Sequence, residues 1–477
     1  MRTRGTVRLS PGTGGSQPAP SLIQRAELLV RAGVPALALR QISDRFCRAD
    51  PRLSSAFARP PYYPATCVDP PSDRGSALSW GVAAARLRCG IRGGRWARVR
   101  AVTITVRSIT AAEHLGFLAD QTITDGNGTT SFLQTPAWAK VKADWRGESV
   151  GFVDGDTLIG VGLILYRSIP RTKLSLAYLP EGPVLDWGGD RVEECLTALK
   201  RHCRKKGAFG VRIGPTLVHR RWSAETIKAG IADESVDRLS NATPDVDNLA
   251  AARLIHTLNR LGWKEQRVDE GFGAGQPRFN FWLPIGDRSE DEILAGMNQL
   301  WRRNIKKAGK LGVEVRQGDR GDLTRFHELY QETAERDHFT GRPLAYFETM
   351  WDALRAEDPD RIRLYLAEHE GDLVAATTWV RVEKHCWYSY GASSTAKREV
   401  RGSNAIQWQM IRDAKAAGAE VYDMRGITEG LTEANSELGL IQFKVGTGGQ
   451  AVEYLGEWDL PINPILHKAF QLYLKRR

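Results

Sequence analysis

The sequence is poor in the patterns that indicate a metal, a disulfide framework or a membrane span. Its six cysteines are scattered over 477 residues without a CxxC pair, which predicts no zinc site and no disulfides and favours a reduced, cytoplasmic setting. No apolar run approaches 18 residues, so no transmembrane helix is expected. A Walker loop, an HExxH motif and a GxSxG motif are also missing. The common motifs of phosphate, zinc and serine chemistry therefore give no starting point.

Acidic residues are scarce only in the first part of the chain. The formal net charge is +11, but residues 1–101 carry 17 arginines, no lysine and five acidic residues, and the rest of the chain is almost neutral. Because this extension has no sustained apolar period, it is predicted to be disordered. Its arginine-rich composition also resembles a transit peptide, and its abrupt end near Val102 suggests a mis-called start. The basic balance is therefore no evidence for nucleic-acid binding by the remainder.

The remainder is long enough for two domains and contains an internal repeat. Each half shows two alternating strands joined by a tight turn, then a third strand, an amphipathic helix and a fourth strand. In the first half these segments are residues 148–169, 175–184, 191–207 and 208–214; in the second they are 362–392 (with the third strand at 386–393), 403–418 and 419–426. Three pairs keep nearly equal separations of 212, 211 and 213 residues: Tyr178 and Tyr390, Gly207 and Gly418, Arg212 and Arg425. The sequence predicts a duplicated β-β-β-α-β unit.

This succession resembles the acyltransferase fold called GNAT, in which the sheet opens to admit an acyl chain. In that fold a basic, glycine-rich loop before the crossover helix binds a pyrophosphate through backbone N–H groups. The segment "REVRGSNAIQWQMI" keeps Arg401 and Gly402, but Ser403 and Asn404 follow where further glycine is expected. The loop is predicted to bind an anion, although its pattern for acetyl-CoA is degraded.

Two GNAT-like halves without a good CoA loop resemble the FemABX family of peptidyltransferases, and within it the FemX-type lipid II aminoacyltransferases. The resemblance rests on seven motifs in family order: "FLQTPAWAKVKADW", "LPEGPVLDW", "RRNIKKAGKLGVEV", "AERDHFTGRPLAYF", "WYSYGAS", "YDMRGI" and "FKVGTGG". It implies an α/β fold with mixed sheets and two tandem GNAT-like domains. The expected organisation is an extension over 1–101, a first domain over 102–277 plus 456–477 that binds the precursor, and a second, catalytic and tRNA-side domain over 278–455.

The resemblance also implies an activity, which is transfer of an amino acid from aminoacyl-tRNA to the side-chain amine of residue three of a peptidoglycan stem pentapeptide. The expected partners are aminoacyl-tRNA and a UDP-linked or lipid-linked muropeptide precursor, the latter at the inner membrane surface. A cytoplasmic monomer without metal or cofactor is expected. Three alternatives stay open, namely a CoA-dependent acetyltransferase, a Fem-like enzyme that aminoacylates a small metabolite, and a non-catalytic binding protein.

Lysine and arginine are the candidate ligands of the precursor's diphosphate. Trp138, Val141 and Trp145 recur at helical spacing, so Lys142 is expected to lie along the apolar face of a helix and lean toward a cleft. The resemblance makes Lys142 a phosphate ligand, with Lys140 a weaker candidate. It assigns Thr340, Arg342, Tyr346 and Tyr390 to the same precursor, and a guanidinium suits bidentate phosphate binding. A solvated lysine and core tyrosines are the plain alternatives.

Lys444 is the candidate catalytic residue. It interrupts the apolar run "LIQFKVGTG", which predicts a strand. A charged side chain inside such a strand is unusual and suggests a specific role. Attack of an amine on an aminoacyl ester produces an oxyanion, which a fixed cation in a partly dry cleft stabilises by about 3 kcal/mol. The resemblance gives Lys444 this role. The alternative is a lysine that protects an edge strand from aggregation.

The general base is not determined by the resemblance. Some relatives have an aspartate in the strand that corresponds to "VRIGPTL", where this chain has Gly214. Asp423 or Glu181 could replace it. A third interpretation, which we favour here, needs no protein base, because an activated ester reacts with an amine with little assistance from proton transfer.

The donor side is predicted at Arg401, Gly402, Ser403 and Asn404, where the expected anion is the 3′ end of a charged tRNA. The helix "LWRRNIKKAGK" places Arg302, Lys306 and Lys310 on one stripe, with Arg303 and Lys307 beside it. This stripe fits either tRNA phosphates or a solvated face. The glycine-rich "GFGAGQ" (271–276) lacks a strand-to-helix context and is interpreted as a connector.

Overall fold

The computed structural model describes residues 103–120, 130–169, 171–266 and 275–475. The N-terminal extension and most of the connector at 271–276 lie outside these ranges, so the predictions for them stay predictions. None of the helices within the described ranges is long and apolar enough to cross a membrane.

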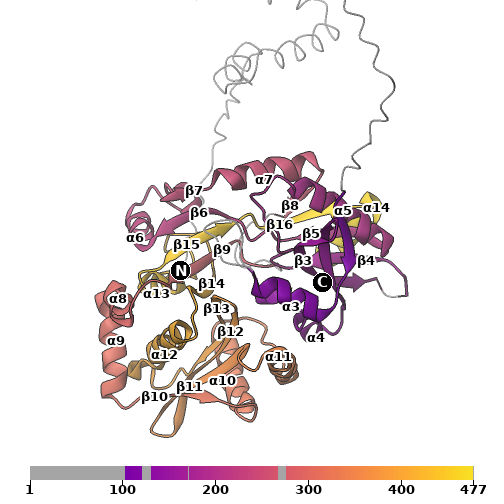
Figure 1. Ribbon diagram of the computed structural model, residues 1–477. Helices are drawn as coiled ribbons and strands as arrows, with labels where there is room; N and C mark the ends of the chain where they lie inside the picture. Colours follow the sequence, from indigo (N-terminus) through magenta and orange to yellow (C-terminus); the bar gives the residue numbers. More distant parts are fainter. Residues whose placement is uncertain (1–102, 121–129, 170, 267–274, 476–477) are drawn as a thin grey trace, which may run out of the picture. The chain divides into compact units, whose positions relative to one another are not determined.

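The first sheet has seven strands in the order β1-β2-β3-β4-β5-β16-β8 (Figure 1). Only β4 and β5 run parallel, and every other neighbouring pair is antiparallel. The strands are β1 (Thr105–Ser108), β2 (Arg146–Asp154), β3 (Thr157–Ser168), β4 (Ser175–Leu179), β5 (Ala208–Ile213), β8 (Lys264–Gln266) and β16 (Glu457–Pro461).

The crossover helix between β4 and β5 is α5 (Val192–Lys205). Its apolar side chains recur every three or four residues, and Leu196, Leu199 and Cys203 are buried in the core of this sheet. Gly207 follows with φ 85°, a left-handed conformation that needs no Cβ. Gly418 ends the matching helix of the second half in the same way, with φ 78°. The equal spacing of this glycine pair therefore marks equivalent helix ends.

The second sheet has nine strands in the order β10-β11-β12-β13-β14-β9-β15-β6-β7. Again one pair, β13 and β14, is parallel and the others are antiparallel. The strands are β6 (Val218–Ser223), β7 (Val246–Asp247), β9 (Phe279–Pro284), β10 (Glu314–Gly318), β11 (Ile362–His369), β12 (Asp372–Val382), β13 (His385–Ser393), β14 (Val421–Ile427) and β15 (Gln450–Tyr454).

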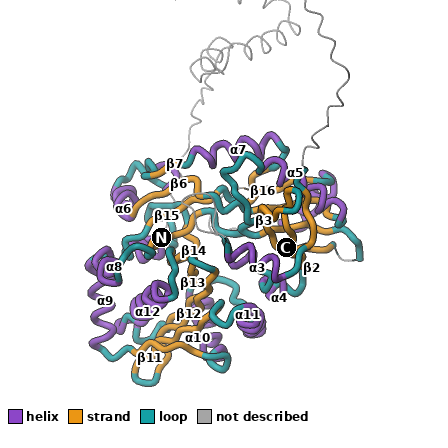
Figure 2. The backbone as a smooth tube through the Cα atoms, in the orientation of Figure 1, coloured by secondary structure: helices purple, strands orange, loops and turns teal. Residues whose placement is uncertain are grey.

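Helices cover both faces of the second sheet (Figure 2). Along β11, Tyr365 and Ala367 face a core that includes α12 (Gly402–Ala416), while Leu364 and Leu366 face a core that includes α10 (Leu323–Arg336) and α11 (Leu344–Glu357). This alternation is what a strand buried on both faces requires. The core that includes α10 and α11 also contains Phe132, Trp138 and Leu163 from the first half of the chain, so apolar packing joins the two halves.

The predicted repeat and GNAT-like fold are confirmed. Strands β2, β3 and β4, helix α5 and strand β5 form one unit, and β11, β12, β13, α12 and β14 form the other, with tight turns at Gly155 and Gly371 as expected. The two units differ in one respect. β4 pairs with β5 over its whole length, whereas β13 pairs with β14 only from His385 to Trp387 and then separates from it. Within the described residues, the parallel pair therefore separates in the second sheet and stays together in the first.

Strand pairing crosses the predicted domain limits. The C-terminal strand β16 joins the first sheet. Strands β6 and β7 precede position 277 but pair in the second sheet, because β6 lies antiparallel to β15. Further helices of the described residues are α3 (Ala111–Ala119), α6 (Ala224–Ala232), α7 (Leu249–Arg260), α8 (Glu290–Gly296), α9 (Gln299–Lys310) and α14 (Pro464–Lys475).

Two local predictions are wrong. The helix expected through Trp145 is a single turn, α4 (Trp138–Val141), that ends where Lys142 takes φ −101° and ψ 48°. Lys444 lies not in a strand but near the end of helix α13 (Leu438–Val445). A short apolar run does not distinguish a buried strand from a buried helix, because all faces of either can be covered by tertiary contacts.

Candidate functional site

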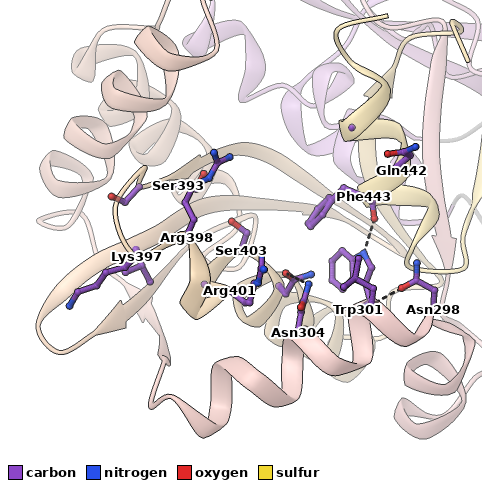
Figure 3. Close-up of a pocket in the computed structure, with 16 residues that line it drawn as sticks. Asn298, Trp301, Asn304, Ser393, Lys397, Arg398, Arg401, Ser403, Gln442 and Phe443 are labelled. Atoms are coloured by element: carbon purple, nitrogen blue, oxygen red, sulfur yellow. Dashed lines mark hydrogen bonds between the residues drawn. The ribbon is translucent and has the colours of Figure 1, made fainter. Parts of the chain in front are cut away.

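A pocket of about 420 Å³ lies beside the end of β13 and the start of α12 (Figure 3). Helices α9, α12 and α13 and the end of β13 form its walls. The rings of Trp301 of α9 and Phe443 of α13 pack with their centroids 4.6 Å apart and their planes tilted by 43°, and the Trp301 indole N–H donates to the Phe443 carbonyl at 2.8 Å. The pocket is lined by Asn298, Leu300, Trp301, Asn304, Val374, Ser393, Ser394, Lys397, Arg398, Arg401, Gly402, Ser403, Asn404, Gly439, Gln442 and Phe443.

The predicted anion-binding loop forms one side of this pocket. Arg401 has φ 64°, a left-handed conformation that costs energy in a residue with a Cβ and turns the chain sharply into α12. Gly402 is required by packing, since a Cβ there would lie 2.7 Å from Val374 Cγ2. The exposed guanidinium groups of Arg398 and Arg401 have no carboxylate partner among the described residues. Two unpaired cations beside a helix N-terminus make a site for an anion.

The start of α12 differs from an ordinary pyrophosphate-binding loop because buried asparagines lie there in place of further glycines. The Asn304 side chain donates to the Asn404 side-chain oxygen at 3.4 Å, and both residues are buried. In the first repeat, by contrast, the Gly188 N–H is taken by Asp186 at 3.2 Å, and Glu193 and Glu194 occupy the first turn of α5. Carboxylates at that helix start repel anions, so in the described part of the chain the start of α12 favours an anion and the start of α5 does not.

A second cationic cluster surrounds Lys142. Its Nζ lies 5.3 Å from the ring centroid of Tyr346 and 5.6 Å from that of Trp138, and the guanidinium of Arg342 lies 5.3 Å from the same Tyr346 ring. Burial lowers the pKa of Lys142 from its ordinary value, and the charge of Arg342 lowers it further, although Asp144 acts in the opposite direction. Two cations held together around one aromatic ring are a suitable arrangement for a diphosphate, which would relieve their repulsion.

The predicted tyrosines belong to this cluster. The hydroxyl groups of Tyr346 and Tyr390 lie 3.1 Å apart, and both rings pack edge-on against Phe347. Burial, followed by the proximity of Tyr390, raises the pKa of Tyr346 above its usual range, so it stays a neutral hydrogen-bonding group. Thr340 is exposed in the loop before α11, and no contact to the other four residues is found in the described part of the chain. Lys140 is exposed on α4, which leaves Lys142 as the better candidate.

Lys444 is 3% exposed and points at the open end of β14. Its Nζ donates to the carbonyl oxygens of Gly426 at 2.6 Å and Arg425 at 3.3 Å. An ammonium group has three donors, so one remains for a reacting oxygen. Burial lowers the pKa of Lys444 to about 7, while the charge of Asp423 opposes this shift. The lysine is therefore close to losing its proton at neutral pH.

This pKa predicts a pH-dependent contribution to stability. In the unfolded chain Lys444 keeps a pKa near 10.5 and in the folded chain about 7, so between these values the unfolded state binds more protons. The free energy of unfolding of the wild type, relative to Lys444→Met, is expected to rise with pH across this window, by about 1.4 kcal/mol per pH unit. Urea denaturation of both proteins at pH 7.0 and pH 9.0 measures it; a difference that does not change with pH would refute the assignment.

A buried polar network links Lys444 to the first half of the chain. Arg425 donates to Glu181 at 3.0 Å and to Gln276 at 3.1 Å, and the Ser131 hydroxyl donates to Glu181 at 2.5 Å. The Arg425 guanidinium also lies 5.7 Å from the ring of Phe132, which packs on Trp138 beside Lys142. The Lys142 cluster and Lys444 are thus connected by directly packed side chains.

Neither carboxylate predicted as a base is free. Glu181 accepts from Ser131 and Arg425. Asp423 accepts from the Trp282 indole at 3.0 Å and the Arg425 backbone N–H at 2.6 Å, and His385 Nε2 lies 3.2 Å from it. These bonds occupy both carboxylates and hold them in position, which suits structural roles better than proton transfer.

Sequence reasoning missed Glu457. It lies on β16, 20 residues before the C-terminal Arg477, and it is 7% exposed. Its carboxylate accepts from the Tyr178 hydroxyl at 2.5 Å and the Gln276 N–H at 3.3 Å, and burial raises its pKa. A Cβ placed on Gly214 would lie 4.0 Å from Glu457 Cγ, so Glu457 stands beside the position of the missing aspartate. No local pattern signals this, because the two residues are far apart in sequence.

Comparisons with known proteins are consistent with this architecture. A family model described as the FemAB family matches residues 120–370 and 364–475. The chain is 24% identical over 431 residues to the lipid II:glycine glycyltransferase of Staphylococcus haemolyticus (strain JCSC1435), covering 76% of this chain and 94% of the relative. It is 24% identical over 434 residues to the protein of the same name from Staphylococcus aureus (strain MRSA252), with the same coverage. A crystal structure of FemX shares the fold, with a TM-score of 0.63 and 22% identity, covering 76% of this chain and 99% of that one.

Proposed function

The chain belongs to the FemAB family, and we propose that it forms a peptide bond on a peptidoglycan precursor. It moves an amino acid from aminoacyl-tRNA to the side-chain amine of residue three of the stem pentapeptide. The observation that carries this proposal is the pair of cationic sites, one at Lys142 and Arg342 and one at Arg401, with Lys444 at the open sheet edge between their supporting elements. Two anionic substrates and one buried cation are what this transfer needs.

The precursor occupies the Lys142 cluster. Lys142 and Arg342 bind the diphosphate, and the hydroxyl groups of Tyr346 and Tyr390 bind the attached sugar and peptide. The relatives named lipid II:glycine glycyltransferases support a lipid-linked precursor, and a UDP-linked one carries the same diphosphate. The protein works in the cytoplasm as a monomer.

The charged tRNA occupies the pocket beside α12. Its terminal phosphates lie against the N-terminal turn of α12 and the guanidinium groups of Arg398 and Arg401. Phe443, half-buried in the pocket wall beside the buried Trp301, is the aromatic side chain that a terminal base contacts. Arg303, Lys306, Lys307 and Lys310 on α9 are exposed and extend this cationic surface toward the acceptor stem.

The reaction is aminolysis of an ester. The stem-peptide amine attacks the carbonyl carbon of the aminoacyl ester, the carbonyl oxygen becomes an oxyanion, and the third N–H of Lys444 stabilises it. The ester bond then breaks, the tRNA 3′ oxygen leaves and takes up a proton, and the amide remains. The attacking nitrogen loses one proton during these steps, and Glu457 is the candidate acceptor because its pKa is raised and it stands beside Gly214.

Replacing Glu457 by glutamine tests this role. Loss of a general base is expected to lower kcat on the order of 10²-fold. In the wild type kcat/KM should fall at acidic pH with an apparent pKa above 4.5, since burial raises the pKa of Glu457, and in Glu457→Gln this acidic limb should disappear. Rates over pH 4.5–8 measure both effects.

Asp459→Asn is the matched control for this variant. Asp459 lies two residues away on β16 and pairs with Arg212, which also contacts Glu457. A disturbed network alone would affect both variants alike and leave the acidic limb in place. The same pH profile in both variants would exclude Glu457 as the base.

Transfer of radiolabel tests the proposed function itself. A mixture of labelled aminoacyl-tRNAs is supplied with purified precursor pentapeptide, with and without RNase treatment of the tRNA. RNase-sensitive labelling of the precursor is expected, and individually charged tRNAs then identify the amino acid. The second candidate is a CoA-dependent acetyltransferase, which the position of the α12 loop favours. Consumption of acetyl-CoA without any tRNA-dependent transfer would establish that alternative.

A further inference from the structure

Helix α14 exposes apolar side chains on its outward face, and no packing in the described structure accounts for them. Ile465 is 82% exposed and Leu472 is 51% exposed, and with Lys468 they recur at i, i+3 and i+7 on one side of the helix. The opposite side holds Phe470, which packs against Phe209 of β5 at 5.2 Å between ring centroids. The helix is therefore anchored by one face and presents apolar side chains and a lysine on the other. Figure 1 shows α14 in yellow beside β5 and β4.

The loop between β3 and β4 adds cations next to this helix. Ile169 and Leu174 of the loop join the small core under α14 together with Phe470. Arg171 and Lys173 are exposed and make no ion pair with any described residue. Neither the segment 167–174 nor α14 contains an acidic residue. An apolar helix face bordered by cations without carboxylates is the composition of a surface that binds anionic lipid headgroups.

The anchored inner face of α14 is connected to the proposed precursor site. The guanidinium of Arg167 lies 5.7 Å from the ring of Phe470 and 5.4 Å from the ring of Trp145. The Trp145 backbone N–H donates to the Lys142 carbonyl at 2.8 Å. A single arginine and a single tryptophan thus separate α14 from the lysine that would hold the diphosphate. In a lipid-linked precursor the diphosphate lies at headgroup level, so a protein that binds it must rest on the bilayer.

We propose that the outer face of α14 and the β3–β4 loop form a membrane-docking surface for an anionic bilayer, which places the Lys142 cluster at the depth of a lipid-linked diphosphate. Ile465 and Leu472 enter the interface, while Arg171, Lys173 and Lys468 contact anionic headgroups. The proposal rests on the proposed function for the identity of the diphosphate, but the docking surface itself can be tested without any transfer reaction.

Vesicle binding is the first test. The full-length protein is sedimented with vesicles of phosphatidylcholine containing phosphatidylglycerol. The variant with Ile465→Glu and Leu472→Glu is expected to bind at least about tenfold more weakly than wild type, because two apolar side chains no longer enter the interface. Arg171→Glu and Lys173→Glu are each expected to weaken binding about fivefold, and only when phosphatidylglycerol is present.

Matched controls come from other exposed positions. Leu249 on α7 is 73% exposed, and Lys228 is exposed on α6. Leu249→Glu and Lys228→Glu are expected to leave vesicle binding unchanged. Equal losses in these controls, or full binding by the α14 double variant, would overturn the proposal. Because Ile465 and Leu472 face solvent, thermal unfolding of the double variant should match that of the wild type, which verifies folding.

A comparison of two precursors separates this proposal from the proposed function. The α14 double variant is expected to lose transfer to precursor embedded in vesicles, by about tenfold or more, and to keep transfer to soluble UDP-linked precursor. An equal loss with both precursors would overturn the docking role. If neither precursor is labelled by the wild type but α14-dependent vesicle binding persists, the proposed function fails and the docking surface stands.

Discussion

Lys444→Met is expected to lower kcat on the order of 10²–10³-fold, the effect of removing one preorganised donor from an oxyanion site. The variant keeps a side chain of similar length but loses the ammonium that donates to Gly426 and Arg425 and, in the reaction, to the oxyanion. The affinity for precursor should stay nearly unchanged, since Lys444 is not part of the Lys142 cluster. Single-turnover rates and a separate binding measurement with precursor distinguish the two effects.

Lys415→Met controls for the loss of a lysine that is hydrogen-bonded to main-chain carbonyls, although Lys415 is only half-buried. Lys415 also donates to two main-chain carbonyls, those of Ile285 at 3.4 Å and Gly286 at 3.3 Å, near the end of α12. It shares this bonding pattern with Lys444, but its carbonyl partners lie just after β9 and not at the open end of β14. Transfer by Lys415→Met should remain near the wild-type rate. An equal fall of kcat in both variants, or a parallel loss of precursor binding in Lys444→Met, would exclude the catalytic role.

Lys142→Met and Arg342→Met are each expected to lower kcat/KM by about 10- to 100-fold, since each removes a charged hydrogen bond to phosphate. The effects should appear as weaker precursor binding with little change in tRNA affinity. They should also be less than additive in the double variant, because both cations bind the same diphosphate around Tyr346. Titration of each variant with UDP-linked precursor gives the affinities directly.

Lys140→Met is the control for the precursor site. Lys140 lies two residues before Lys142 on α4, carries the same charge and is exposed. Its removal should leave kcat/KM within about twofold of wild type, as expected for a solvated surface charge. A large loss in Lys140→Met, or fully additive effects of Lys142→Met and Arg342→Met, would argue against a shared diphosphate site.

The repeat could be predicted because each unit is built from local patterns. Alternating strands, an amphipathic helix and a left-handed glycine at the helix end leave their periods in the sequence, and they recur with nearly equal spacing at Gly207 and Gly418. The exchange of strands between the sheets leaves no such trace. β6 joins the second sheet and β16 joins the first because of pairings between residues more than 200 positions apart.

The candidate site was predictable in its residue types and less so in its geometry. Lys142, Arg342, Tyr346 and Tyr390 do come together. The exposed Thr340 does not join them in the described structure. The sequence placed Lys444 in a strand, and the structure places it in a helix, because an apolar run of this length has no period that distinguishes the two.

By itself the sequence determined the two tandem acyltransferase units, the degraded pyrophosphate loop at Arg401 and the identity of the cations, since these depend on local periodicity and residue chemistry. Only the tertiary structure decided that the second sheet opens while the first stays paired, that Asp423 and Glu181 are occupied, and that Glu457 stands beside Gly214. The physical reason is that burial, pairing and pKa depend on which distant segments pack together, and free energies of packing have no local signature in the chain.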